Sequence, residues 1–156
     1  PGQECSRAPK CAEEYRARIS GPLLDRIDIQ IEVPAVSPWD LADVRPGESS
    51  DEIRKRVIAA REIQKKRFAA FGCPSLLTNS QLKGELLEQA AALDNEAKAL
   101  LLSYADRTAM SARAYHRTLR LARTIADLQN ENKLLRIHIA EALSLRWKTP
   151  DYKSRR

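Results

Sequence analysis

Hydrophobic and polar residues alternate strictly over residues 27–33, near the start of the chain. The apolar residues occupy every second position and are Ile27, Ile29, Ile31 and Val33. A period of two is typical of a half-buried β-strand, and Pro34 ends the run because proline lacks an amide donor. The pattern therefore predicts one strand, for which the rest of the chain offers no evident partner strand.

From residue 49 onward the apolar positions follow a helical period. Ser49 and Glu52 form a capping box ahead of a first helix that ends near Gly72. Its apolar stripe consists of Ile53, Val57, Ala60, Phe68 and Phe71. Further helices are predicted over about 80–91, 95–107, 111–128 and 136–147, with caps at Asn79 or Ser80, at Asp94 and at Ser111.

These elements predict a mainly α fold in three parts. Residues 49–147 are expected to form a compact helical bundle, and residues 148–156 a basic, disordered tail. Residues 1–48 carry a loop, a short helix, the single strand and a linker. We expect this part to be poorly ordered in isolation, because a lone strand cannot satisfy its backbone groups.

The composition suits an aliphatic core and a polyanionic partner. The 156 residues are 43% hydrophobic but only 5% aromatic, and the net charge of +6 favours polyanions without requiring one. No apolar run approaches the roughly 18 residues of a membrane span. Three cysteines are too few for a disulfide framework. We therefore expect a cytoplasmic protein with no membrane partner.

The helix predicted over 111–128 carries a narrow cationic stripe opposite its apolar face. The stripe consists of Arg113, Arg117 and Arg120. Arginines this close repel one another, so an anionic group is expected to face them. One alternative is a carboxylate such as Asp127 or Glu96, and the other is a phosphate. His116 lies on the exposed flank of this helix, and no second metal-ligating residue stands at a suitable spacing from it. We therefore assign it no chemistry.

Two of the predicted helices also resemble a helix-turn-helix. Residues 95–107 and 111–128 are joined by a brief turn, and the second helix would present its arginines to DNA phosphates or base edges. A stand-alone DNA-binding helical module is therefore the alternative function from a different class.

Arg26 lies between two aspartates just ahead of the strand, in the segment LLDRID. It is either a surface arginine neutralised by Asp25 and Asp28, or an arginine offered to a phosphate, which guanidinium binds with two parallel hydrogen bonds. Cys5 and Cys11 are the other candidate ligands near the N-terminus. No second pair or nearby histidine completes a tetrahedral site, so these two residues alone predict no metal centre.

The run ISGPLLDRIDI at 19–29, with EVP shortly after it and SAR at 111–113, resembles the magnesium-chelatase-like AAA+ ATPases of the bacterial ComM type, a family of competence-associated helicases. The resemblance implies that Arg26 is an arginine finger acting in trans and that Arg113 is the sensor-2 arginine of the lid. It also implies ATP and Mg²⁺, a hexameric ring of identical subunits, and DNA branch migration in recombination. Relatives carry more cysteines upstream, so Cys5 and Cys11 would be half of a metal site. A true magnesium chelatase subunit is a lower-ranked alternative.

The chain lacks the parts that hold a nucleotide. ATP hydrolysis needs a phosphate loop of the form GxxxxGK[ST], and none of the five glycines stands in such a motif. We therefore expect this chain to bind no ATP or Mg²⁺ unaided and to be inactive alone. The fold implied is the helical lid of an AAA+ protein, preceded by a remnant of its α/β core, as a C-terminal piece of a larger protein.

Overall fold

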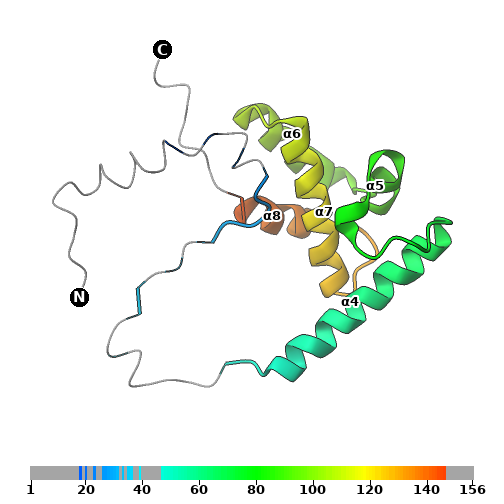
Figure 1. The fold of residues 1–156 in the computed structure, drawn as a ribbon. Coiled ribbons are helices and arrows are strands. Elements are labelled where there is room, and N and C mark those ends of the chain that lie inside the picture. Colours follow the sequence, from blue (N-terminus) through cyan, green and yellow to red (C-terminus); the bar gives the residue numbers. More distant parts are fainter. Residues whose placement is uncertain are drawn as a thin grey trace, which may run out of the picture.

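The computed structural model describes residues 18, 20, 23, 26–31, 33, 35, 36, 39 and 47–146. Its elements are α4 (Ser50–Ala70), the 3₁₀ turn η1 (Asn79–Gln81), α5 (Gly84–Ala90), α6 (Asn95–Thr108), α7 (Ala112–Leu128) and α8 (Arg136–Ser144). Figure 1 shows α7 near the centre of the bundle. Within these ranges the fold is mainly α and contains no sheet, which confirms the predicted class. None of their helices has the length and apolarity to span a bilayer.

α7 organises the bundle. It packs against α4, η1, α5 and α8, whereas α6 packs on α8. The large apolar side chains that are fully buried come from several elements and are Phe68, Leu82, Leu87, Leu101, Leu134 and Ile139. All but one are aliphatic, as the composition predicts.

The predicted caps of three helices are present. Ser49 accepts a hydrogen bond from the Glu52 amide at 3.3 Å, while the Glu52 carboxylate accepts one from the Ser49 amide at 3.1 Å. Asp94 and Ser111 each accept a hydrogen bond from the amide three residues further on, at 2.6 and 3.1 Å. Since these caps satisfy backbone donors that a helix leaves open, they fix where α4, α6 and α7 begin.

The predicted start of the helix over about 80–91 is wrong. Residues 79–81 form η1 instead, and α5 begins only at Gly84, where φ is +50°. Asn79 cannot cap a helix because its side chain is engaged inside the bundle. Its Oδ1 accepts a hydrogen bond from Arg67 at 3.3 Å, and its Nδ2 donates one to Asp127 at 2.8 Å. The last helix is also shorter than predicted, since α8 ends at Ser144.

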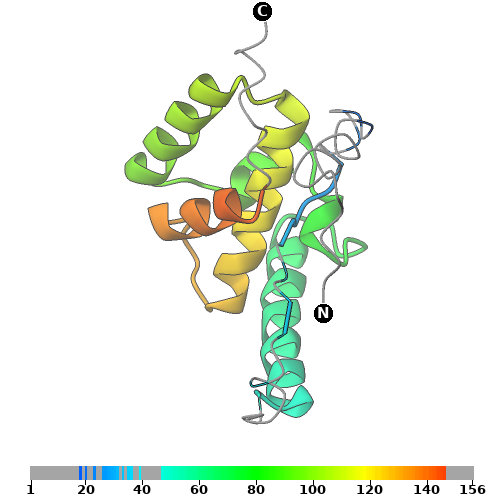
Figure 2. The same cartoon turned by 90° about the vertical axis from the view of Figure 1, so that its left-hand side faces the viewer.

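The two halves of α4 have different surroundings. Ala60, Gln64 and Phe68 in its second half are buried, whereas Ile53 and Val57 on the same stripe are 43% and 45% exposed. Figures 1 and 2 show the first half of α4 projecting beyond the other helices. The apolar stripe predicted from sequence is therefore a core face only in the second half.

The strand predicted over 27–33 is not formed in the described residues of that range. Its alternating apolar side chains are exposed, and the chain there is irregular. The amide of Gln30 donates to the carbonyl of Leu145, just after α8, at 2.8 Å. A strand needs a paired neighbour, and the described part of the chain supplies none. The predictions for the N-terminal loop and for the tail over 148–156 fall outside the described residues.

Candidate functional site

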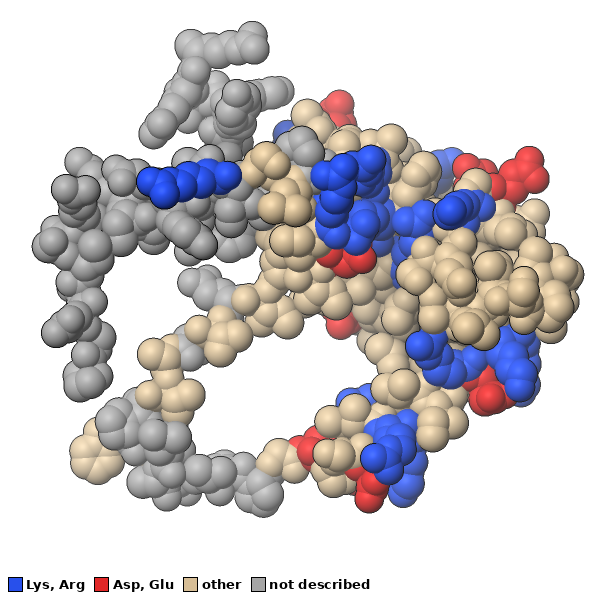
Figure 3. Space-filling model, in the orientation of Figure 1, with Lys and Arg blue, Asp and Glu red and all other residues tan. Residues whose placement is uncertain are grey.

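The candidate site is a cationic hollow on the surface of the bundle. It has a volume of about 520 Å³ and is lined by Arg26, Arg113, His116, Arg117 and Arg120. In Figure 3, Lys and Arg side chains gather where the segment before α4 meets the helices. The structure therefore brings together all four arginines that the sequence analysis selected, from two distant parts of the chain. It also adds His116, to which that analysis gave no role.

Helix α7 places three of these arginines on one face. Arg117 and Arg120 follow Arg113 by four and seven residues, which is the spacing of one helical face. Ser111 fixes the start of the helix, so Arg113 lies in its first turn. Backbone N–H groups and the helix dipole favour an anion there.

The three arginines differ in their hydrogen-bond partners within the chain. Arg117 binds Asp28 with two hydrogen bonds, one of them at 2.8 Å, and Nε of Arg120 donates to the Leu82 carbonyl at 2.9 Å. Arg113 is exposed and makes no ion pair within the described ranges. Arg113 is therefore the member of the stripe most available to an incoming anion.

The neutralising carboxylate is one that the sequence analysis did not choose for this stripe. Asp28 forms the ion pair with Arg117, although the two residues lie far apart in the sequence. Asp127 faces the interior, and Glu96 lines a different hollow on α6. The expectation that a carboxylate faces the stripe therefore holds for Arg117, but the residue is Asp28 and neither Asp127, which binds other arginines, nor Glu96.

Those other arginines form a buried cluster that sequence analysis missed. Asp127 accepts hydrogen bonds from Arg67 at 3.0 Å, from Arg123 at 3.0 Å and from Asn79 at 2.8 Å. Arg123 also donates to the carbonyls of Asn132, at 2.8 Å, and Glu131. Burial lowers the pKa of the Arg123 guanidinium, and the charge of Asp127 opposes that effect. The signal that could have indicated part of this cluster is the i, i+4 spacing of Arg123 and Asp127.

His138 lies buried near this cluster, at the start of α8. Its Nδ1 accepts a hydrogen bond from the Leu135 amide at 3.0 Å, so Nδ1 carries no proton. Its Nε2 lies 3.1 Å from Oε1 of Gln129 and is therefore the donor. Burial lowers the pKa of His138, and the nearby charge of Arg123 lowers it further. The imidazole is thus held neutral as a structural cap.

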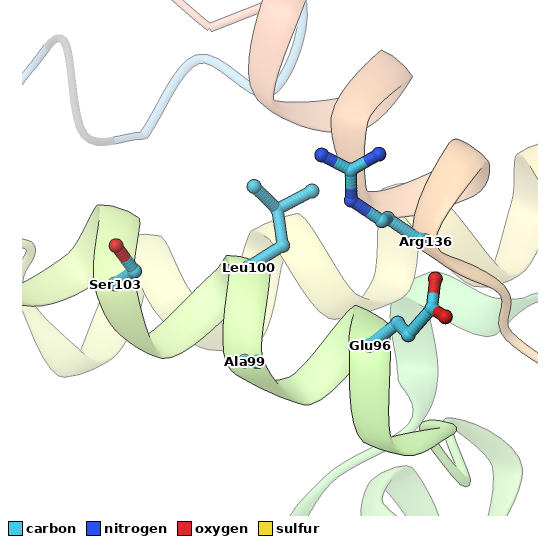
Figure 4. Close-up of a pocket in the computed structure, with 5 residues that line it drawn as sticks. All are labelled: Glu96, Ala99, Leu100, Ser103 and Arg136. Carbon is cyan, nitrogen blue, oxygen red and sulfur yellow. The ribbon is translucent and has the colours of Figure 1, made fainter.

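A second hollow offers a comparison. It measures about 320 Å³ and is lined by Glu96, Ala99, Leu100 and Ser103 of α6 and by Arg136 of α8. Figure 4 shows both charged side chains beside the apolar Leu100. Because its lining carries both signs of charge, it has no general preference for a phosphate.

The hollow lined by arginines suits the phosphates of a nucleotide but not their metal. Arginine and histidine offer hydrogen-bond donors to phosphate, whereas Mg²⁺ requires oxygen ligands. Over the described ranges no group of three histidine, cysteine, aspartate or glutamate residues could hold a metal. Cys5 and Cys11 lie outside those ranges, so their proposed half site stays a prediction.

The packing of the helices bears on the helix-turn-helix alternative. In that motif the first helix packs directly on the recognition helix. Here α6 packs mainly on α8, and α7 packs mainly on α8 and α4. Moreover, Arg117 and Arg120 are each engaged by groups of the chain itself. This arrangement argues against a DNA-reading helix pair.

Comparisons with known proteins match nearly the whole chain. The family described as magnesium chelatase, subunit ChlI C-terminal, matches residues 47–146, and the family described as magnesium chelatase, subunit ChlI, matches residues 1–41. The competence protein ComM of Haemophilus influenzae is 36% identical over 140 residues, which is 89% of this chain and 26% of ComM. The uncharacterized protein YifB of Escherichia coli is 37% identical over 139 residues, 88% of this chain and 26% of YifB.

The chain spans only about a quarter of the length of these curated relatives. YifB of Salmonella typhimurium repeats the pattern, at 35% identity over 139 residues, 88% of this chain and 26% of that protein. One family match ends at residue 41 and the other begins at residue 47, so their boundary lies between the segment that carries Arg26 and the helical bundle. The hollow is therefore built from residues on both sides of that boundary.

Proposed function

Because the chain belongs to the family of the magnesium chelatase subunit ChlI C-terminal region, we propose that it is the lid and arginine-finger portion of an oligomeric AAA+ ATPase. The parent would be a helicase of the ComM type that binds ATP and Mg²⁺. Its work would be DNA branch migration in recombination during natural transformation. The ring would be a hexamer of identical subunits, with DNA as its substrate.

One observation supports this proposal above the others. The family resemblance implies that Arg26 is an arginine finger and Arg113 the sensor-2 arginine, and these two residues, distant in sequence, line one hollow. Arginines contribute to phosphoryl transfer by stabilising the negative charge that develops on the transferring phosphoryl group. Two guanidinium groups facing the same space can act on the same group of oxygens.

The shared hollow sharpens the roles of the two arginines. If Arg26 reaches the nucleotide of a neighbouring subunit, then Arg113 of the same chain faces that nucleotide too. The residues that line the hollow offer Mg²⁺ no carboxylate oxygen, and the chain has no phosphate loop, so the nucleotide would be held by another part of the assembly. Mg²⁺ bound with it there would neutralise charge on the phosphate oxygens. We therefore infer that both arginines complete a site which the rest of the ring provides.

The proposal is tested in the full-length protein with Arg26→Ala and Arg113→Ala, measuring ATP hydrolysis and nucleotide binding separately. An arginine finger contributes about 10³- to 10⁵-fold in rate. We expect each variant to lose at least a hundredfold in turnover while nucleotide binding changes far less.

Arg107→Ala is the matched control, because Arg107 is an exposed arginine at the end of α6 that stacks on Tyr104 instead of lining the hollow. We expect its turnover to be unchanged. Normal turnover in both Arg26→Ala and Arg113→Ala would refute the proposed roles.

A further inference from the structure

The contact between Asp28 and Arg117 joins the segment that carries Arg26 to the lid helix α7. Nη2 of Arg117 donates to Oδ2 of Asp28 at 2.8 Å, and Nε donates to Oδ1. Two parallel hydrogen bonds between guanidinium and carboxylate fix direction as well as distance. This pair therefore restrains how the segment lies against α7, in a way that a single contact would not.

A second contact between this segment and the bundle lies two residues later. The amide of Gln30 donates to the carbonyl of Leu145, at the end of α8, at 2.8 Å. On the other side of Arg26, its own amide donates to the carbonyl of Leu23 at 2.9 Å and closes a turn. Arg26 is thus held between a local turn and two contacts with the bundle.

The apolar side chains of this segment are only partly covered. Ile27, Ile29 and Ile31 are 41%, 48% and 70% exposed. Arg26 is also exposed, and it lines the hollow together with Arg113 and Arg117. The polar contacts of Asp28 and Gln30 therefore help to keep Arg26 beside Arg113.

We propose that Asp28 and Arg117 are positioning residues, whose ion pair sets Arg26 opposite Arg113 so that both meet the same phosphate. The proposal rests on the function proposed above and assigns a task to two residues that need not touch the nucleotide themselves. Catalysis by positioned groups is sensitive to placement, since a displacement of about 1 Å can cost about a hundredfold in rate.

The competing role for Arg117 is direct contact with the phosphate. In that case Asp28 would compete with the nucleotide for the same guanidinium, and removing its charge would strengthen nucleotide binding. The positioning role predicts the opposite pattern. Loss of Asp28 would lower kcat and leave nucleotide affinity nearly constant.

The test is a double-mutant cycle in the full-length protein with Asp28→Asn, Arg117→Gln and both together. We expect each single variant to lower kcat about 10- to 100-fold with a small change in KM for ATP. The double variant should be no slower than the slower single one, because residues that act through one contact are not additive. Multiplying losses, or tighter nucleotide binding in Asp28→Asn, would overturn the positioning role.

A structural readout on this chain complements the cycle. Amide hydrogen exchange at Gln30 should become faster in Asp28→Asn and in Arg117→Gln, because the ion pair helps to hold its hydrogen bond to Leu145. Asp51→Asn is the matched control, since it breaks another exposed ion pair, with Arg54 on α4, at 3.1 Å. Unchanged exchange at Gln30 in the two test variants would contradict the proposal.

The two proposals fail in different ways. If Arg26→Ala and Arg113→Ala both leave turnover normal, the function proposed above fails and the positioning role fails with it. If those variants lose turnover while Asp28→Asn and Arg117→Gln keep a normal kcat, only the positioning role is wrong.

Discussion

Helix α7 carries one buried arginine and three arginines that line a surface hollow. On one side, Arg123 is buried to 1% exposure and is bound by Asp127 and two backbone carbonyls. On the other side, Arg113, Arg117 and Arg120 line an open hollow, and Arg113 makes no ion pair with any described residue. The same residue type on one helix therefore occupies two different environments.

The difference shows what decides the task of an arginine. A guanidinium inside the bundle must be paired, because an unpaired buried charge is costly, so Arg123 and Arg67 share one carboxylate. A guanidinium at the surface can remain open, because water solvates it until an anion arrives. The Asp127 cluster therefore suits a role in stability, and the nucleotide chemistry proposed above concerns the hollow only.

The largest effect on stability is expected from Asp127→Asn. This change keeps the side-chain shape but leaves Arg67 and Arg123 without a counter-charge inside the bundle. Breaking a buried ion pair in this way costs about 3–5 kcal/mol. Chemical denaturation of this chain measures the loss in the free energy of unfolding.

Asp28→Asn is the matched control for that measurement, because it makes the same chemical change at another carboxylate bound by arginine. The Asp28 side chain is 48% exposed, and its pair with Arg117 is open to solvent screening. We expect its cost to stay below about 1 kcal/mol. Equal losses in the two variants would remove the distinction between the buried arginines and those of the hollow.

A smaller effect on the free energy of unfolding is expected from acidification, because His138 lies beside the buried cluster. The pKa of His138 is lowered in the folded protein, so the unfolded chain, with an ordinary pKa of about 6.5, binds more protons at acidic pH. The free energy of unfolding should therefore fall as the pH drops below about 6.5, by at most about 1.4 kcal/mol per pH unit for one proton.

Unfolding measured between pH 7.5 and pH 5, values that bracket this range, tests the prediction. In His138→Gln this part of the pH dependence should be absent, while His116 on the hollow stays in place. If the pH dependence is the same in the variant and in the unmodified chain, the buried imidazole is not the titrating group.

Local sequence signals predicted much of the fold and of the hollow. The caps at Ser49, Asp94 and Ser111 fixed three helix starts, and the 100° spacing placed three arginines on one face of α7. These features depend on residues a few positions apart, so a single sequence suffices to find them. Arg26 was selected through a resemblance, since its local sequence left two interpretations open.

The features that were missed depend on contacts between distant residues. Asp28 meets Arg117, and Asp127 meets Arg67 and Asn79, across large sequence separations. Local periodicity carries no information about such pairs. The same reason explains η1, because the buried contacts of Asn79 outweigh its preference for a cap position.

The central claim is that Arg26 and Arg113 of one chain act on one nucleotide, and rings mixed from two variants test it directly. Full-length Arg26→Ala and Arg113→Ala proteins, each inactive alone, would be co-expressed and their ATP hydrolysis measured in the mixed ring. If the two arginines serve one site, every site contains a defect, and we predict no recovery of turnover. If they serve different sites, about a quarter of the sites in a randomly mixed ring would regain both arginines, and that recovery would contradict the account.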